Sequence, residues 1–317
     1  MKQHEFVKQR RTQWQEFSDM LKDPEQCKER DMPKMYRQLS HDLAIAKSRH
    51  YSPVVVNHLN QLLLLGQQQL YKPVNHIFSP LLHFVQHTFP EHLLQLRSYI
   101  LWAHFLFYGI ALLAFGITLF EPDFVRNVMA NIDVVQLEKM YDPSSAHYAK
   151  ERAADSDFVM FGYYIMHNIS IAFQCFVGGL LLGFGALYFL LFNALFFGAV
   201  SGHIVNIGYT STFFSFVITH GAFELSAIVL SAAAGMVVGI HLIRPGKVSR
   251  LEALQESARL TFPIIFGAFL LLMIAAFIEA FWSSSISIPS VVKYVVGSIC
   301  WLWMLFYIFR RGADADR

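Results

Sequence analysis

Charged side chains are scarce in this chain of 317 residues. Asp, Glu, Lys and Arg make up 15% of it, below the roughly 25% of a soluble domain, while 55% of its residues are hydrophobic. Residues 99–120 carry no charge, and residues 158–243 carry only Glu224. Apolar runs longer than about 18 residues indicate membrane-spanning helices. The sequence therefore excludes a large soluble core.

Cysteine is equally rare, and its placement excludes two further classes. Cys27, Cys175 and Cys300 are far apart and form no CxxC pair, so neither a disulfide framework nor a zinc knuckle is predicted. The net charge of +2 gives no indication of nucleic-acid binding. The first residues are charged rather than apolar, so no cleavable signal peptide is expected.

Residues 1–98 are polar and show helical periodicity. Phe6, Trp14, Phe17 and Leu21 recur at spacings that place them on one face of an amphipathic helix, and prolines separate this segment from similar ones. We predict an all-α protein in which residues 1–98 form a cytoplasmic helical domain and residues 99–317 form a transmembrane helix bundle.

Six membrane spans are predicted within this bundle. Their ranges are 99–120, 161–180, 184–205, 212–242, 262–282 and 289–309. The second and third come from one apolar block, which as a single helix would measure roughly 65 Å at 1.5 Å per residue, about twice a bilayer core. Gly178, Gly179, Gly183 and Gly185 supply a break. A re-entrant hairpin in this block is the alternative.

Orientation follows from the basic residues, which favour the cytoplasmic side. The loop 121–160 contains eight acidic and four basic residues, whereas the loop after residue 243 carries Arg244, Lys247, Arg250 and Arg259. The first loop is therefore predicted to be extracytoplasmic and the second cytoplasmic. With six spans, both termini lie in the cytoplasm of a bacterium, and the chain is a multi-pass protein of the inner (plasma) membrane.

Small residues recur inside the spans. Gly179 and Gly183, and again Gly235 and Gly239, have the GxxxG spacing that lets helix backbones approach closely. Tight packing within the bundle explains this pattern, and the face of a homodimer is the alternative.

Ionisable and polar side chains at membrane depth are the candidate functional residues, because their insertion costs on the order of 2.5–3.5 kcal/mol each. His220 and Glu224 share a helix face, four residues apart. Glu279, His167 and Asn168 are expected near the same depth and Asn193 deeper. The predicted intramembrane polar cluster is listed in full here: His167, Asn168, Asn193, His220, Glu224 and Glu279.

Four interpretations of this cluster remain open. It could be a hydrogen-bonded network that fixes helix packing, a proton or ion relay in a transporter, a metal or hydrolase site, or a site for a ligand or lipid. The spacing HGxxE differs from the HExxH of zinc proteases, and neither GxSxG nor a phosphate-binding glycine loop occurs. No catalytic residue, metal ligand or cofactor is therefore predicted.

Several segments resemble the stage II sporulation protein M family of integral membrane proteins. They are Phe6–Trp14, Tyr36–Ala44, His167–Phe173 with Gly183 and Asn193, Thr219–Ile228, Arg244–Gly246 and Ile274–Ala280. The segment Thr219-His-Gly-Ala-Phe-Glu-Leu-Ser-Ala-Ile228 is the most specific. The resemblance covers nearly the whole chain.

This resemblance implies a scaffold or assembly component of a cell-envelope complex, with no established activity of its own. Members in spore formers act with peptidoglycan-processing partners during engulfment. The long N-terminal domain is similar to a broader branch of the family, whose members are found beside an AAA-type ATPase and other membrane proteins. A transporter or conduit that uses His220, Glu224 and Glu279 is the alternative function.

Overall fold

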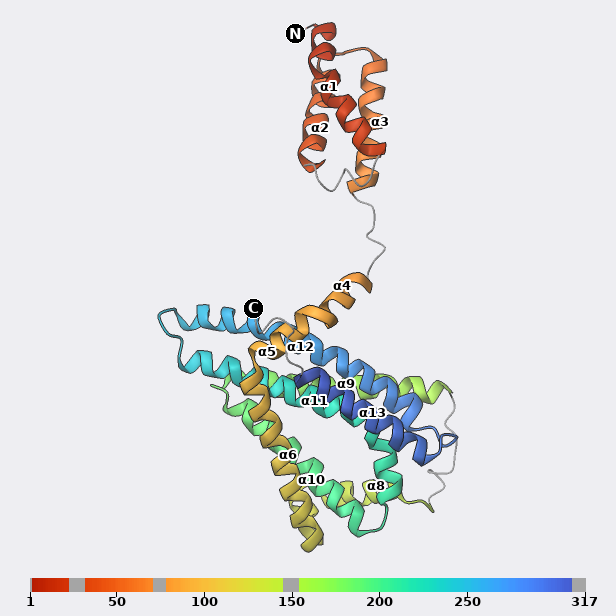
Figure 1. Ribbon diagram of the computed structural model, residues 1–317, viewed down its shortest axis with the longest axis vertical. Helices are drawn as coiled ribbons and strands as arrows, with labels where there is room; N and C mark the ends of the chain where they lie inside the picture. Colours follow the sequence, from red (N-terminus) through yellow and green to blue (C-terminus); the bar gives the residue numbers. More distant parts are fainter. Residues whose placement is uncertain (1, 23–31, 71–77, 145–153, 310–317) are drawn as a thin grey trace. The chain divides into compact units, whose positions relative to one another are not determined.

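The computed structural model describes residues 2–22, 32–70, 78–144 and 154–309, and every regular element in these ranges is a helix (Figure 1). Residues 145–153 of the predicted loop 121–160 lie outside the described residues. Contacts divide the chain into two units, Met1–Phe78 and Ser79–Arg317. The predicted class, an all-α membrane protein with an N-terminal helical region, is confirmed.

The N-terminal unit is a three-helix bundle of α1 (Gln3–Lys22), α2 (Met32–Ser48) and α3 (Pro53–Leu70). Its core contains Phe6, Trp14, Phe17, Leu39 and Leu59, each buried. The periodicity of α1 explains this arrangement, since Phe6, Trp14 and Phe17 share the face that turns toward α2 and α3. The unit therefore has its own hydrophobic core.

The second unit holds the remaining elements. They are α4 (Phe78–His83), η2 (Phe84–Thr88), α5 (Phe89–Gln95), α6 (Arg97–Phe120), η3 (Pro122–Phe124), α7 (Val125–Val128), α8 (Asn131–Tyr141), α9 (Ala154–Val177), η4 (Gly178–Leu180), α10 (Phe184–Asn206), α11 (Thr210–Ile243), α12 (Arg250–Phe277), η5 (Ile278–Ser283) and α13 (Ser290–Phe309). Residues 79–96, which the sequence analysis assigned to the first domain, pack here. The Phe89 ring fits against Gly267, and the Tyr307 hydroxyl donates to the Val85 carbonyl at 2.5 Å.

Five helices in the described ranges are long and apolar enough to span a membrane. They are Arg97–Phe120, Phe184–Asn206, Thr210–Ile243, Arg250–Ser283 and Ser290–Phe309. The predicted span 161–180 falls in α9, which has 24 residues but is not among the five. The sequence of α9 includes His167, Asn168 and Gln174, which lower its hydropathy.

Helix α11 is the centre of the membrane unit. Of its most apolar stretch 72% is buried inside the protein, against 28% for α13, and it contacts α6, α9, α10, α12 and α13. We call the two ends of the bundle the 210 end, where α11 begins, and the 243 end, where it ends. Because lipid reaches little of α11, polar groups on it face other helices rather than hydrocarbon.

Helices α9 and α10 together run the depth of the bundle twice. Phe161 of α9 packs against Phe277 near the 210 end, and the Cys175 carbonyl lies beside Gly235 toward the 243 end. The chain then reverses at Gly183, whose φ of +82° favours glycine. Helix α10 returns, and its Asn206 amide donates to the Thr118 carbonyl at 2.7 Å. Each helix is longer than the roughly 30 Å bilayer core.

The two GxxxG segments face each other within one chain. A Cβ atom added to Gly179 would lie 2.1 Å from the Gly235 carbonyl oxygen, and one added to Gly239 would lie 2.1 Å from the Gly183 nitrogen. Both distances are impossible for real side chains, so these glycines allow direct backbone contact between the α9–α10 turn and α11. The small residues therefore serve packing within the bundle.

Candidate functional site

The site begins on α11, where His220 and Glu224 lie one helical turn apart. The distance from His220 Nε2 to Glu224 Oε2 is 3.9 Å. The His220 side chain is 6% exposed, and the Glu224 side chain is 19% exposed. Both side chains are placed on the 210 half of the central helix, so they lie inside the protein at membrane depth.

Glu279 reaches the same place from η5, a π-helical turn that ends α12. It is buried at 9% exposure, and ligand atoms of His220, Glu224 and Glu279 all lie within 4.8 Å of one another. Two ionised carboxyls at this separation would repel by roughly 3–4 kcal/mol at an effective dielectric of about 20. A proton or a cation between them would remove this repulsion. π-Helical turns often occur at functional sites.

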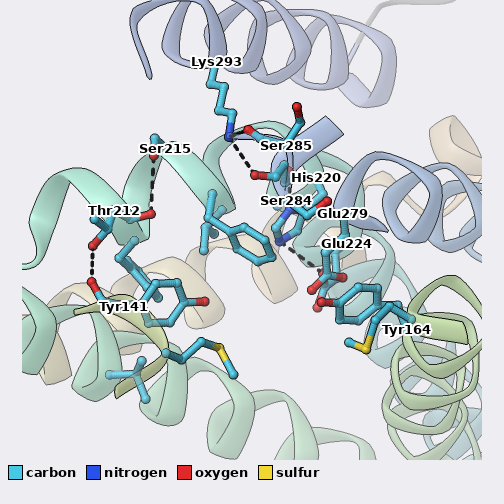
Figure 2. Close-up of a pocket in the computed structure, with 18 of the residues that line it drawn as sticks. Tyr141, Tyr164, Thr212, Ser215, His220, Glu224, Glu279, Ser284, Ser285 and Lys293 are labelled. Atoms are coloured by element: carbon cyan, nitrogen blue, oxygen red, sulfur yellow. Dashed lines mark hydrogen bonds and ion pairs between the residues drawn. The ribbon is translucent and has the colours of Figure 1, made fainter. Parts of the chain in front are cut away.

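Two further side chains fix the position of η5. Ser283 Oγ lies 3.0 Å from His220 Nδ1, which joins η5 to α11. Lys293 of α13 is buried, and its Nζ donates to the carbonyls of Ser283 and Ser285 at 2.7 and 2.8 Å. The Ser283 contact holds Nδ1 of the imidazole toward η5, so that Nε2 faces Glu224. Figure 2 shows His220 beside Glu224, with Lys293 reaching toward Ser285.

Helix α9 supplies a third side of the site. Asn168 is 2% exposed and its side chain interacts with the Glu224 carboxyl, although its Nδ2 does not reach full hydrogen-bond geometry with any described residue. His167 lies next to it, stacked on the Tyr163 ring with centroids 5.7 Å apart. Figure 2 shows the Tyr164 hydroxyl directed toward the carboxyl groups.

Helix α8 closes part of the site from the loop that follows α6. The Thr212 hydroxyl donates to the Tyr141 carbonyl at 2.6 Å and so ties the end of α8 to the start of α11. Tyr141 is buried, and burial, followed by the nearby carboxyl of Glu279, raises the pKa of its hydroxyl. Its side chain therefore shares the electrostatic environment of the cluster.

These groups line one cavity of about 570 Å³. His167, Asn168, His220, Glu224 and Glu279, five of the six predicted residues, are among its lining residues. Met140, Tyr163 and Ile286 line it and are themselves well exposed, so the cavity opens to the protein surface at the 210 end. Its volume is in the range of small-molecule sites.

Asn193, the sixth predicted residue, is separate from the cluster. It is only partly buried, its Nδ2 donates to the Phe189 carbonyl at 2.8 Å within α10, and it does not line the cavity. The sequence analysis expected Asn193 deeper than the other five residues, and depth does not determine which way a helix face points.

Lys293, Ser283 and Tyr141 were missed by the sequence analysis. Lys293 carried a usable signal, because it is a single charge within the predicted span 289–309, as unusual there as Glu224 in its own span. Ser283 and Tyr141 carried none, since both fall outside the predicted spans, Tyr141 in the loop 121–160 and Ser283 just after the span 262–282.

With this geometry described, a comparison with protein families identifies the chain. The model of the family "Stage II sporulation protein M" matches residues 98–284. The chain belongs to the stage II sporulation protein M family. The matched stretch contains all six predicted site residues and ends before α13, so Lys293 comes from outside it. The suggested family is thus confirmed.

The N-terminal unit matches a separate model. Residues 4–72, which include most of α1 and all of α2 and α3, match a domain of unknown function (DUF8413). No match was found among curated proteins or among solved structures. This stage II sporulation protein M family chain therefore combines two recognisable parts, one within each of its two structural units.

Proposed function

We propose that this chain is an assembly component of a cell-envelope membrane complex whose membrane unit binds a small, positively charged ligand. One observation carries the ligand part of the proposal: the carboxyl groups of Glu224 and Glu279, from different helices, meet in a cavity of about 570 Å³. A polar network that served packing alone would fill this space with side chains.

The cavity is one-sided, which favours binding over conduction. Its lining on α11 ends at Leu225. Beyond that residue α11 is almost entirely buried, and at Gly235 and Gly239 it touches neighbouring backbone. A ligand can therefore enter from the 210 end, but the packed 243 half gives it no onward path. The relay interpretation of the cluster receives less support than ligand binding.

A stability screen tests ligand binding. The purified full chain in detergent is heated with small cations, including divalent metal ions, polyamines and amino sugars. We expect at least one class to raise the melting temperature, because a ligand that binds only the folded state stabilises it. Glu224→Gln should abolish the shift, and Asn193→Ala, outside the cavity, should keep it. A panel that never shifts the melting temperature would contradict the proposal.

A flux assay separates binding from conduction. The chain is reconstituted into liposomes under a proton gradient, with protein-free liposomes and Glu224→Gln as references. We expect the three preparations to lose the gradient at the same rate. A leak at least tenfold faster with the unaltered chain, abolished by Glu224→Gln, would instead establish a proton relay.

The assembly role is supported by family membership and by the N-terminal unit, whose separate core makes it a folded module available to partners. Co-purification from native membranes in mild detergent tests it. We expect enrichment of envelope proteins, with an AAA-type ATPase or a peptidoglycan-processing protein among them. An unrelated membrane protein with the same tag is the control. Recovery of the chain without any partner would contradict this role.

A further inference from the structure

We infer that the cavity binds a divalent transition-metal ion of the Zn²⁺ class, with His220, Glu224 and Glu279 as its ligands. This inference rests on the proposed ligand-binding function and names the ligand class. One imidazole and two carboxylates are a donor set that Zn²⁺ accepts in proteins, and the ligands come from two elements, α11 and η5. The HGxxE segment contains only His220 and Glu224. The third ligand, Glu279, is distant in sequence and reaches the other two only through the fold.

The distances are close to those of a bound ion. The candidate ligand atoms lie within 4.8 Å of one another, and His220 Nε2 is 3.9 Å from Glu224 Oε2. Atoms that share a Zn²⁺ at 2.0–2.2 Å in tetrahedral geometry lie about 3.3–3.6 Å apart. Side-chain rotations that move the ligand atoms by roughly an ångström would bring all three within bonding distance of one ion. No helix would have to move.

The imidazole is already oriented for this role. Its Nδ1 lies 3.0 Å from Ser283 Oγ, which leaves Nε2 as the atom that faces Glu224. Histidine ligands usually hold their second ring nitrogen in such a hydrogen bond, which fixes both the tautomer and the ring plane.

Asn168 supports the same cluster from α9. Its side chain is buried, lines the cavity and interacts with the Glu224 carboxyl, although its Nδ2 does not reach full hydrogen-bond geometry with any described residue. Buried amide groups are nearly always paired. A Glu224 carboxylate drawn slightly inward as a metal ligand would remain the acceptor of Nδ2.

The charges also balance. A divalent cation with two carboxylates and a neutral imidazole has no net charge, which suits a site at membrane depth. Lys293 also lines the cavity, but its Nζ donates to the carbonyls of Ser283 and Ser285. Its ammonium group is therefore engaged by backbone oxygens.

Metal content of the purified full chain tests the inference. The protein is stripped with a chelator, equilibrated with Zn²⁺ and analysed by mass spectrometry for bound metal, and Co²⁺ absorption reports the ligand type. We expect one equivalent in the unaltered chain and at least tenfold weaker binding in Glu279→Gln and His220→Ala. Asn168→Ala leaves all three metal ligands in place and should bind Zn²⁺ about tenfold more weakly than the unaltered chain.

A surface histidine pair provides the control. His83 and His87 lie with ring centroids 4.9 Å apart and could collect metal by themselves. The double variant His83→Ala, His87→Ala should retain one equivalent of Zn²⁺ per chain. If it loses the metal while His220→Ala keeps it, the inference is wrong. A second outcome is that neither the unaltered chain nor any variant binds metal, while organic cations still raise the melting temperature in a Glu224-dependent way. The metal inference then fails and the proposed function stands. If neither class binds, both fail.

Discussion

Buried charges in this chain are held by specific partners, and Asp42 is the clearest case outside the membrane. Its carboxyl is 1% exposed and accepts a hydrogen bond from Trp14 Nε1 at 2.9 Å. Gln38 also donates to it, and Arg10 Nε lies 3.5 Å away. One side chain thus joins α1 to α2 in the N-terminal unit.

Replacing Asp42 by alanine should loosen this unit by about 2–3 kcal/mol, because the buried Trp14 N–H would lose its acceptor. Hydrogen exchange in α1 and α2 of the full chain measures the effect, with faster exchange expected there and no change in the membrane unit. Glu16→Ala is the matched control on an exposed position of α1. Unchanged protection in Asp42→Ala would show that the carboxyl does not hold α1 to α2.

Individual residues also show how much of the candidate site could be predicted from the sequence. Glu224 and Glu279 could be chosen because a carboxyl in an apolar run is costly and needs a partner. Their convergence with His220 could only be suggested, since depth was known and helix order was not. Asn193, which was expected deeper than the others, shows the limit of this reasoning, because its amide bonds to its own helix at Phe189 and does not line the cavity.

At the scale of elements, two features position the site. The π-helical turn η5 carries Glu279 and Ser283 toward α11, and the α9–α10 turn packs its backbone directly on α11 at the opposite end. The second feature packs the 243 half tightly, and the cavity lining on α11 lies in the 210 half. Packing of small residues and placement of the polar cluster are thus linked through one helix.

This packing predicts a sharp difference between two glycine-to-alanine changes. Gly239→Ala should destabilise the membrane unit by about 1–3 kcal/mol, because the new methyl group would lie 2.1 Å from the Gly183 nitrogen. Gly109→Ala on α6 meets nothing within 4 Å and should cost nothing. Thermal unfolding in detergent compares them. Equal melting temperatures for the two variants would disprove the close backbone contact.

The elements themselves were largely predictable, with informative exceptions. Long apolar runs located the spans, and paired glycines located the break between α9 and α10. The site helix α9 was predicted as an ordinary span, but its hydropathy is lowered by the groups that line the cavity, such as His167 and Asn168. Residues 79–96 were predicted to belong to the first domain, whereas their contacts group them with the second unit, because Phe89 packs against Gly267, a contact that the sequence does not reveal.

At the scale of the whole molecule, the orientation in the membrane decides from which side a ligand can enter the cavity. The cavity opens at the 210 end, close to α8 and the segment between η5 and α13. If the acidic loop 121–160 is extracytoplasmic, as its charges predict, the ligand enters from outside the cell. The N-terminal unit would then lie in the cytoplasm, so that a single chain could connect an external ligand with an internal partner.

Two matched cysteine variants test this orientation. Lys139 on α8 and Lys247 in the loop after α11 are both exposed. In spheroplasts, a membrane-impermeant maleimide should label Lys139→Cys, and it should label Lys247→Cys only after permeabilisation, at least tenfold more than before. The unaltered chain measures labelling of the native cysteines. The reverse pattern would place the mouth of the cavity in the cytoplasm, where cytosolic cations would be its ligands and Lys247 would face the exterior against the positive-inside rule.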